Sequence, residues 1–187
     1  MVKKITIYLD TNILRDAMAR RNKDSTYWLN RIKEKNWTCI TSVLGITELI
    51  DIDQDHLYVN RQLSRHVDFD RIYRDKYHRN LDVSEFQTIK DAVSNFLSEY
   101  SFIKVVSLDD DAWKLFLHIS SNSNLFSPDA IHLAAAWRNN ADLIITSDAH
   151  FIEEGTKLLE QEKVKSKLRI CNPQQVRKTL KKMKVCV

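Results

Sequence analysis

The stretch IYLDTNIL, residues 7–14, joins the end of an apolar run to an aspartate, and the fold prediction starts from it. The apolar run over 4–9 predicts a buried strand, and this strand stops abruptly at Asp10. Burying a carboxylate costs free energy unless the group is paired or hydrogen-bonded. Asp10 could cap a helix that starts near Thr11, which is a common role for aspartate, or it could bind a cation.

Short apolar runs recur along the chain, and segments with helical spacing lie between them. Strands that alternate with helices predict a parallel sheet covered on both faces. The predicted fold class is α/β, with a central, mainly parallel sheet in a single domain over 1–187. The predicted strands are 4–9, 37–41, 103–108, 142–146 and 168–171.

Residues 50–100 depart from this alternation and predict a helical insertion or extension on the single domain. Within them, the stretch 60–80 interleaves aromatic with basic residues. It could guide RNA by charge and stacking, or it could be a solvated helical hairpin whose aromatic residues face the core or a partner. The basic residues that would contact RNA are Arg61, Arg65, Arg71, Arg74, Lys76 and Arg79.

The composition is that of an ordinary globular protein, with 43% hydrophobic and 29% charged residues in 187. No window approaches 18 consecutive apolar residues, and the first apolar run is too short for a signal peptide, so we expect a cytoplasmic protein without a membrane partner. Cys39, Cys171 and Cys186 show no zinc spacing, and we expect buried or free thiols. The four tryptophans, Trp113 among them, lie in apolar patterns that predict core positions.

The net charge of +4 hides an asymmetry between the two parts of the chain. Residues 157–187 carry ten Lys or Arg against two Glu, so the first 156 residues carry a charge of about −4. This basic C-terminal segment could face a polyanion, or it could be a solvated terminal helix.

Carboxylates follow several of the predicted strands. Asp10 follows the first strand, Glu48 lies two turns into the helix after the second, and Asp148 follows 142–146. Asp129 lies in the first turn of a helix that Ser127, as the cap, and Pro128 are predicted to open. Because ligands bind outside the carboxyl ends of parallel strands, these acids are expected to converge.

Converging carboxylates repel one another, so such a group needs protons or cations. Two unit charges about 4 Å apart cost on the order of 4 kcal/mol at an effective dielectric constant near 20. Oxygen ligands without a nearby Cys or His cluster suit Mg²⁺ or Mn²⁺. Each acid also has a structural alternative, as a helix cap, a surface residue or a turn residue.

Three stretches together resemble the PIN domain, the nuclease fold of VapC-type toxins in bacterial toxin–antitoxin pairs. They are YLDTNIL (8–14), ITSVLGITELI (40–50) and SPDAIHLAAAWRNNADLIITSDAHF (127–151). The resemblance implies a three-layer PIN-like fold and a metal-dependent endoribonuclease that acts on single strands. It implies metal binding by Asp10, Glu48, Asp129 and Asp148, with supporting roles for Asn12, Thr146, Thr11 and Ser147.

The predicted reaction is hydrolysis of RNA phosphodiester bonds with Mg²⁺ or Mn²⁺, giving 5′-phosphate and 3′-hydroxyl ends. Two alternatives stay open: a PIN-like module that binds RNA or protein without turnover, and a PIN-like nuclease that acts on DNA. The resemblance also implies a cognate antitoxin and a homodimer. His132 and His150 flank the acids, but exposed or core-edge positions are expected for them rather than catalytic ones.

Overall fold

The computed structural model describes residues 4–162 and 168–185. It divides into two compact units. The first unit comprises Met1–Ile46 and Phe102–Val187, and the second comprises Thr47–Ser101. The predicted insertion at 50–100 falls inside the second unit, whereas the single-domain assignment stays a prediction.

Five parallel strands of the described residues form one sheet in the first unit, in the order β3-β2-β1-β4-β5. Every strand lies within two residues of the ends predicted from the sequence. The α/β prediction with a parallel central sheet is therefore confirmed. The strands are β1 (Thr6–Leu9), β2 (Thr38–Ser42), β3 (Ile103–Val106), β4 (Leu143–Ile145) and β5 (Arg169–Cys171).

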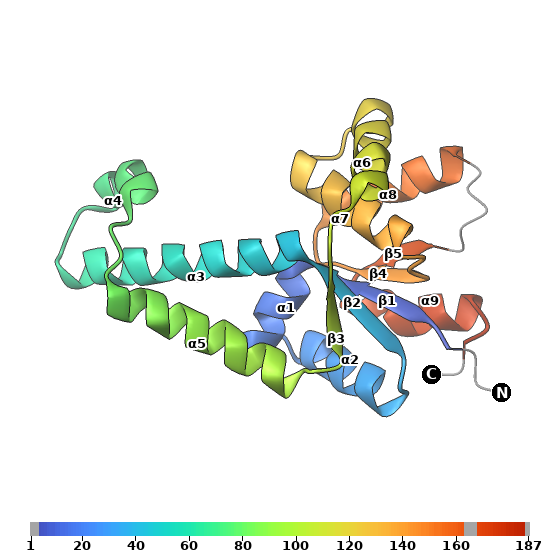
Figure 1. Cartoon of the computed structure of the whole chain (residues 1–187), viewed down its shortest axis with the longest axis horizontal. Helices are drawn as coiled ribbons and strands as arrows, with labels where there is room; N and C mark the ends of the chain where they lie inside the picture. The colour runs from blue at the N-terminus through green and yellow to red at the C-terminus, as the bar shows by residue number, and fades with distance from the viewer. Residues whose placement is uncertain (1–3, 163–167, 186–187) are drawn as a thin grey trace. The chain divides into compact units, whose positions relative to one another are not determined.

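Helices cover both faces of this sheet and make the first unit a three-layer structure (Figure 1). On one face lie α6 (Asp110–Asn122), α7 (Ser127–Arg138) and α8 (Ala149–Gln161). On the other lie α1 (Thr11–Met18), α2 (Lys23–Glu34) and α9 (Val176–Lys182), which follows a 3-10 turn, η2 (Pro173–Gln175). The central strands are apolar on both sides because both faces are covered.

Alternate side chains of β1 point to opposite faces of the sheet, and each face has its own layer of buried side chains. Ile7 and Leu9 are fully buried, and Tyr8, which points to the opposite face, packs in a cluster with Ala130 and Ala134 of α7. Alanines on α7 let this helix approach the sheet closely. The only polar atom of the Tyr8 side chain therefore lies inside the core, where it needs a partner.

Two predictions from the sequence are wrong in this unit. Ser127 is the first residue of α7 rather than its cap, because Phe126 takes the N-cap position without a side-chain hydrogen bond. The shift is one residue and leaves Asp129 in the first turn. Trp113 is 56% exposed on α6, not in the core.

The second unit is helical. It contains most of α3 (Val43–Ser64), together with α4 (Phe69–Asp75), the 3-10 turn η1 (Lys76–His78) and α5 (Val83–Glu99). Ion pairs connect these elements: the guanidinium of Arg61 lies 2.7 Å from Glu85, and that of Arg79 lies 2.8 Å from Asp55.

No helix of the described residues is long and apolar enough to cross a membrane. Cys39 and Cys171 are free and buried, as expected, and burial raises the pKa of both thiols, that of Cys171 to about 11. Cys186 lies outside the described residues.

Candidate functional site

Asp10 lies where β1 ends and α1 begins, and it is 5% exposed. Its backbone N–H donates to the carbonyl of Ile145, which ends the neighbouring strand β4. Its Oδ1 accepts a 2.7 Å hydrogen bond from the backbone N–H of Thr11, so Asp10 is the N-cap of α1. The predicted cap role is confirmed, and the cap uses only one of the two carboxylate oxygens.

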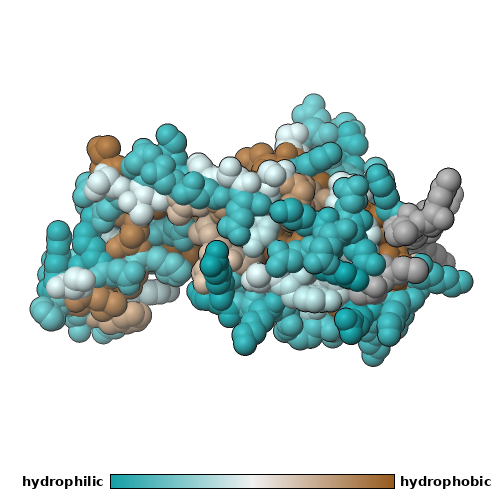
Figure 2. All heavy atoms as spheres, turned by 90° about the horizontal axis from the view of Figure 1, so that it is seen from below, coloured by the Kyte–Doolittle hydropathy of each residue, from teal (hydrophilic) through white to brown (hydrophobic). Residues whose placement is uncertain are grey.

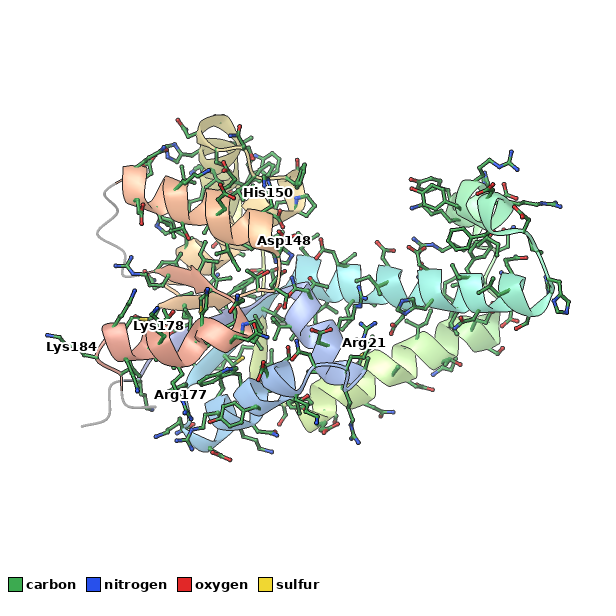
Figure 3. The ribbon with its side chains drawn as sticks, turned by 180° about the vertical axis from the view of Figure 1, so that it is seen from behind. Arg21, Asp148, His150, Arg177, Lys178 and Lys184 are labelled. Carbon is green, nitrogen blue, oxygen red and sulfur yellow. The ribbon has the colours of Figure 1, made fainter. Side chains whose placement is uncertain are left out.

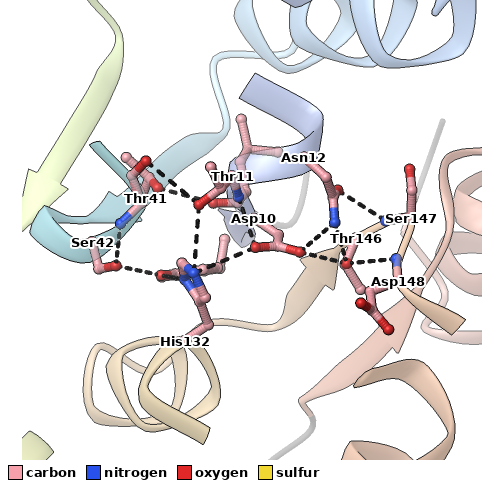
Figure 4. A network of polar contacts seen from close by, with 12 residues as sticks. Asp10, Thr11, Asn12, Thr41, Ser42, His132, Thr146, Ser147 and Asp148 are labelled. Atoms are coloured by element: carbon pink, nitrogen blue, oxygen red, sulfur yellow. Dashed lines mark hydrogen bonds and ion pairs between the residues drawn. The ribbon is translucent and has the colours of Figure 1, made fainter. Parts of the chain in front are cut away.

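That second oxygen, Oδ2, joins the ends of β1 and β4 (Figure 4). It accepts 2.6 Å hydrogen bonds from Nδ2 of Asn12 and from Oγ1 of Thr146. Asn12 also accepts from the backbone N–H of Ser147 at 3.0 Å, and Thr146 Oγ1 accepts from that of Asp148 at 3.0 Å. Asn12 and Thr146 therefore hold both the Asp10 carboxylate and the loop that carries Asp148.

Asp148 is the N-cap of α8, where its Oδ1 accepts a 2.9 Å hydrogen bond from the backbone N–H of Phe151. Its side chain is exposed at the start of the helix, beside the carboxyl end of β4 (Figure 3). The cap uses one carboxylate oxygen of Asp148, and the side chain stays exposed at the edge of the sheet.

The surroundings of Asp129 raise the pKa of its carboxyl group. Burial raises it from its ordinary value, and the negative charges of Asp148 and Asp10 raise it further, to about 6. The nearby His132 and His150 act in the opposite direction but do not cancel this effect. Asp10, Asp129 and Asp148 thus form one cluster with negative charge in excess, and an oxygen-preferring divalent cation fits that excess.

His132 is a site residue whose importance the sequence did not reveal. It is 1% exposed, and its Nε2 lies 3.5 Å from Oδ1 of Asp10. On its other side, Nδ1 lies 2.6 Å from Oη of Tyr8, and Oη lies 2.8 Å from Oγ of Ser42. The expectation of an exposed or core-edge histidine was wrong because Tyr8 gives the ring a buried polar partner. The signal available was the spacing of three residues from Asp129, which puts both on one side of α7.

The chain passes close to this network at the start of α3. The hydroxyl of Thr11 donates to the carbonyl of Gly45 at 3.4 Å, and the N–H of Gly45 donates to Ser42 Oγ at 3.2 Å. A Cβ at position 45 would lie 2.8 Å from Oγ1 of Thr41. Glycine is therefore needed for the close approach of α3 to the buried network.

The other predicted residues take different positions. Glu48 lies on α3 in the second unit, and its part in the site stays a prediction. The six basic residues predicted to contact RNA also lie in the second unit. His150 packs on the ring of Phe126 and contacts the carbonyl of Asn124 at 3.0 Å, which is a structural role.

In the described part of the basic C-terminal segment, the Lys and Arg side chains of α9 and of the turn that follows it are exposed. Arg177, Lys178 and Lys184 point outward from this end of the first unit (Figure 3). Residues 163–167 and 186–187 of the segment lie outside the described residues.

The chain is similar to known proteins in its sequence pattern and in its fold. The model of the family described as the PIN domain matches residues 7–155. No curated protein sequence is similar enough to count as a match.

Solved structures share the fold at low sequence identity. FitAcB from Neisseria gonorrhoeae is 14% identical, with a TM-score of 0.55 over 91% of this chain and 99% of the other. VapBC2 from Rickettsia felis, bound to a DNA fragment from their promoter, is 13% identical, with a TM-score of 0.53 over 90% of this chain and 98% of the other.

Proposed function

Since the chain belongs to the PIN domain family, we propose that it is a metal-dependent endoribonuclease that hydrolyses phosphodiester bonds of single-stranded RNA. We also propose that it is the toxin of a toxin–antitoxin pair. The resemblance of its sequence to VapC-type toxins and the fold that it shares with VapBC2 support this assignment.

The observation that carries the proposal is the cluster of Asp10, Asp129 and Asp148 at one edge of the sheet. Burial, together with the negative charges of Asp148 and Asp10, raises the pKa of Asp129 to about 6, and a bound cation relieves the repulsion between the carboxylates. Helix capping uses one oxygen each of Asp10 and Asp148, so capping alone does not account for three carboxylates at one edge of the sheet.

Mg²⁺ or Mn²⁺ would be held by Asp10, Asp129 and Asp148, with Glu48 as the fourth carboxylate that the family resemblance implies. When bound, such an ion lowers the pKa of its water and offsets the negative charge that builds up on the phosphate. The four acids supply oxygen ligands only, which is the ligand type that both ions prefer.

The chain's own residues orient the carboxylates. Hydrogen bonds from Thr11 and Thr146 fix the two oxygens of Asp10, and Asn12 restrains the same side chain. Asp129, whose pKa is near neutrality in the absence of metal, can hold a proton that it loses when a cation binds. No side chain needs to act as a nucleophile, so water attacks and the products carry 5′-phosphate and 3′-hydroxyl ends.

The test is cleavage of a labelled single-stranded RNA by the purified protein with Mg²⁺, Mn²⁺ or EDTA. We expect cleavage only with a divalent cation, and we expect Asp10→Asn to abolish it. Asp110→Asn is the matched control, because Asp110 is an exposed aspartate at the start of α6. Wild-type activity in Asp10→Asn, or binding of RNA without products when Mn²⁺ is present, would refute the nuclease assignment.

Competition separates the possible substrates and partners. A DNA of the same sequence should neither be cut nor slow RNA cleavage strongly; if DNA is the better substrate, the RNA assignment is wrong. A toxin should be inhibited by the small protein encoded beside it, and co-expression with that neighbouring reading frame tests the pairing. Sedimentation velocity tests the homodimer that the resemblance implies.

A further inference from the structure

Basic and acidic residues are unevenly distributed along the sequence of the second unit. Residues 47–101 contain seven Lys or Arg and eleven Asp or Glu, a net charge of −4. Six of the seven cations, but only three of the eleven acids, lie in 61–80. This stretch therefore carries +3 in a unit whose remaining residues carry −7. A basic patch on an acidic unit indicates a specific anionic partner rather than general solvation.

Two of these six cations are used inside the unit. Arg61 pairs with Glu85 at 2.7 Å and donates to the carbonyls of Asn80 and Arg79. Arg79 pairs with Asp55 at 2.8 Å and with Asp51 at 3.3 Å. Both side chains connect α3 with the segment that leads into α5, so they are not available for a ligand.

The other three arginines are presented to solvent. Arg65 and Arg74 are exposed and have no ion pair with any described residue, and Arg71 has only a loose contact of 3.6 Å with Asp75. Arg65 and Arg71 border a hollow of about 710 Å³. Its lining includes Arg61, Arg65, Arg71, Arg79, His78 and Asp75. Of these arginines, Arg65 and Arg71 are suited to phosphate oxygens, which an arginine binds through two N–H groups.

Two exposed aromatic rings lie next to the remaining cation of the stretch, Lys76. Tyr73 is 64% exposed and Tyr77 is 81% exposed. The Nζ of Lys76 lies 4.8 Å from the ring centre of Tyr73 and 5.3 Å from that of Tyr77. In the view from below, hydrophobic and hydrophilic residues are interspersed on the visible face of the second unit (Figure 2).

We propose that the surface formed by Arg65, Tyr73, Arg74, Lys76 and Tyr77, here called the α4 surface, binds single-stranded RNA. Unpaired bases stack on the two tyrosine rings, and phosphates contact the arginines and Lys76. A protein partner would need a continuous apolar contact, whereas these rings are separated by cations. This inference rests on the proposed function, because it gives the nuclease a binding site for its substrate outside the carboxylate cluster.

The experiment measures the affinity of the full chain for a short, unstructured, fluorescein-labelled RNA by anisotropy in EDTA, where no cleavage occurs. We expect Tyr73→Ala and Tyr77→Ala each to weaken binding about tenfold, and Tyr77→Phe to retain it, because only the ring is needed. Tyr27→Ala, at a 44% exposed tyrosine of α2, is the aromatic control. Hydrogen exchange in the second unit checks that each variant is folded.

The cations are tested by salt dependence. In the double variant Arg65→Ala/Arg74→Ala, the slope of log affinity against log salt should decrease by about 1.4, because each lost phosphate contact on a single strand contributes about 0.7. Lys90→Ala, at an exposed cation of α5, should leave the slope unchanged.

The outcomes separate this inference from the nuclease assignment. Asp110→Asn should bind RNA as the wild type does, since Asp110 is an exposed acid of α6 outside both the cluster and the α4 surface. If the tyrosine variants bind RNA normally while Asp10→Asn is inactive, the α4 surface is refuted and the nuclease assignment stands. Unchanged RNA affinity together with lost self-association in sedimentation velocity would assign the surface to contact between copies and also refute the inference.

Discussion

The hydroxyl oxygen of Tyr8 lies 2.6 Å from Nδ1 of His132, and both side chains are buried between the sheet and α7. The opposite nitrogen of the ring lies 3.5 Å from Asp10. The Tyr8 hydroxyl can donate its proton either to His132 or to Ser42. In both arrangements, a proton on Nε2 of His132 avoids repulsion between this nitrogen and the Asp10 carboxylate that it faces. Tyr8 therefore acts on Asp10 through the histidine.

Tyr8→Phe tests this relationship. The variant keeps the ring and loses the contacts with His132 and Ser42, so we expect the free energy of unfolding to fall by about 1–3 kcal/mol. We expect kcat to decrease and KM for RNA to stay unchanged, because the carboxylate loses its orientation while the RNA contacts remain. Denaturant unfolding and steady-state kinetics measure the two effects.

Tyr27→Phe is the control for that experiment, because Tyr27 is exposed on α2. A Tyr8→Phe protein that loses stability but keeps its full kcat would limit Tyr8 and His132 to a packing role. His132→Gln, which can still donate to Asp10, should retain more activity than His132→Ala at equal saturation with metal.

Thr146→Val and Thr146→Ser separate the hydroxyl of Thr146 from its shape. Thr146 is fully buried, and its Oγ1 contacts Oδ2 of Asp10, Nδ2 of Asn12 and the backbone N–H of Asp148. Valine has nearly the same volume but no hydroxyl, so we expect a loss of about 1–3 kcal/mol and weaker metal binding. Serine keeps the oxygen and should bind metal almost normally. Equal metal affinity in both variants, measured by calorimetry, would contradict the role assigned to the hydroxyl.

The pKa of Asp129 makes stability and metal binding depend on pH. Because the folded-state pKa of about 6 is above the ordinary value, the folded protein holds this proton more tightly than the unfolded chain. Stability without metal should therefore fall as pH rises from about 4 to 6. Asp129→Asn removes this loss, so the variant should gain stability relative to the wild type over the same range, as denaturant unfolding in EDTA would measure.

Divalent-cation affinity should follow the same ionisation. Below pH 6 a proton competes with the metal at Asp129, so affinity should rise by up to about tenfold per pH unit and level off above pH 6. Asp110→Asn should not alter this profile, because Asp110 is exposed on α6. A wild-type affinity that is constant between pH 5 and 7 would show that Asp129 is not a ligand.

The ends of the strands were predictable from the sequence, and the positions of two of the clustered aspartates follow from them. Each strand is a short apolar run, and parallel strands bring their carboxyl ends to one edge, so Asp10 and Asp148 could be placed without knowing any contact. His132 could not be placed in this way. Its partner Tyr8 is 124 residues away, and the helical pattern of α7 does not tell which strand it covers.

The basic residues of the second unit illustrate the same limit. In the sequence Arg61 and Arg79 look like Arg65 and Arg74, because all four lie in one amphipathic stretch. Their difference depends on Glu85, Asp51 and Asp55, which tertiary structure brings to the first two only. Trp113 was misplaced for a related reason: an apolar helical pattern does not tell whether a partner covers that face.

For Gly45→Ala, helix propensity and the tertiary structure predict changes of opposite sign in the free energy of unfolding. Propensity alone predicts a gain of up to about 1 kcal/mol, because alanine is the better helix former. The structure predicts a loss of about 1–3 kcal/mol, because the new Cβ would lie 2.8 Å from Oγ1 of Thr41. Thr41 is fully buried, and its hydroxyl donates to the carbonyl of Leu9 at 3.0 Å, so it cannot move away.

Gly155→Ala is the matched control for this prediction. Its Cβ would meet Cδ1 of Ile170 at 2.6 Å, but that atom is the far end of a flexible side chain, so the loss should be smaller. The double variant Thr41→Ala/Gly45→Ala removes the obstructing oxygen and should be less destabilised than the sum of the single changes. If Gly45→Ala is as stable as the wild type in denaturant unfolding, α3 does not need a glycine to approach Thr41.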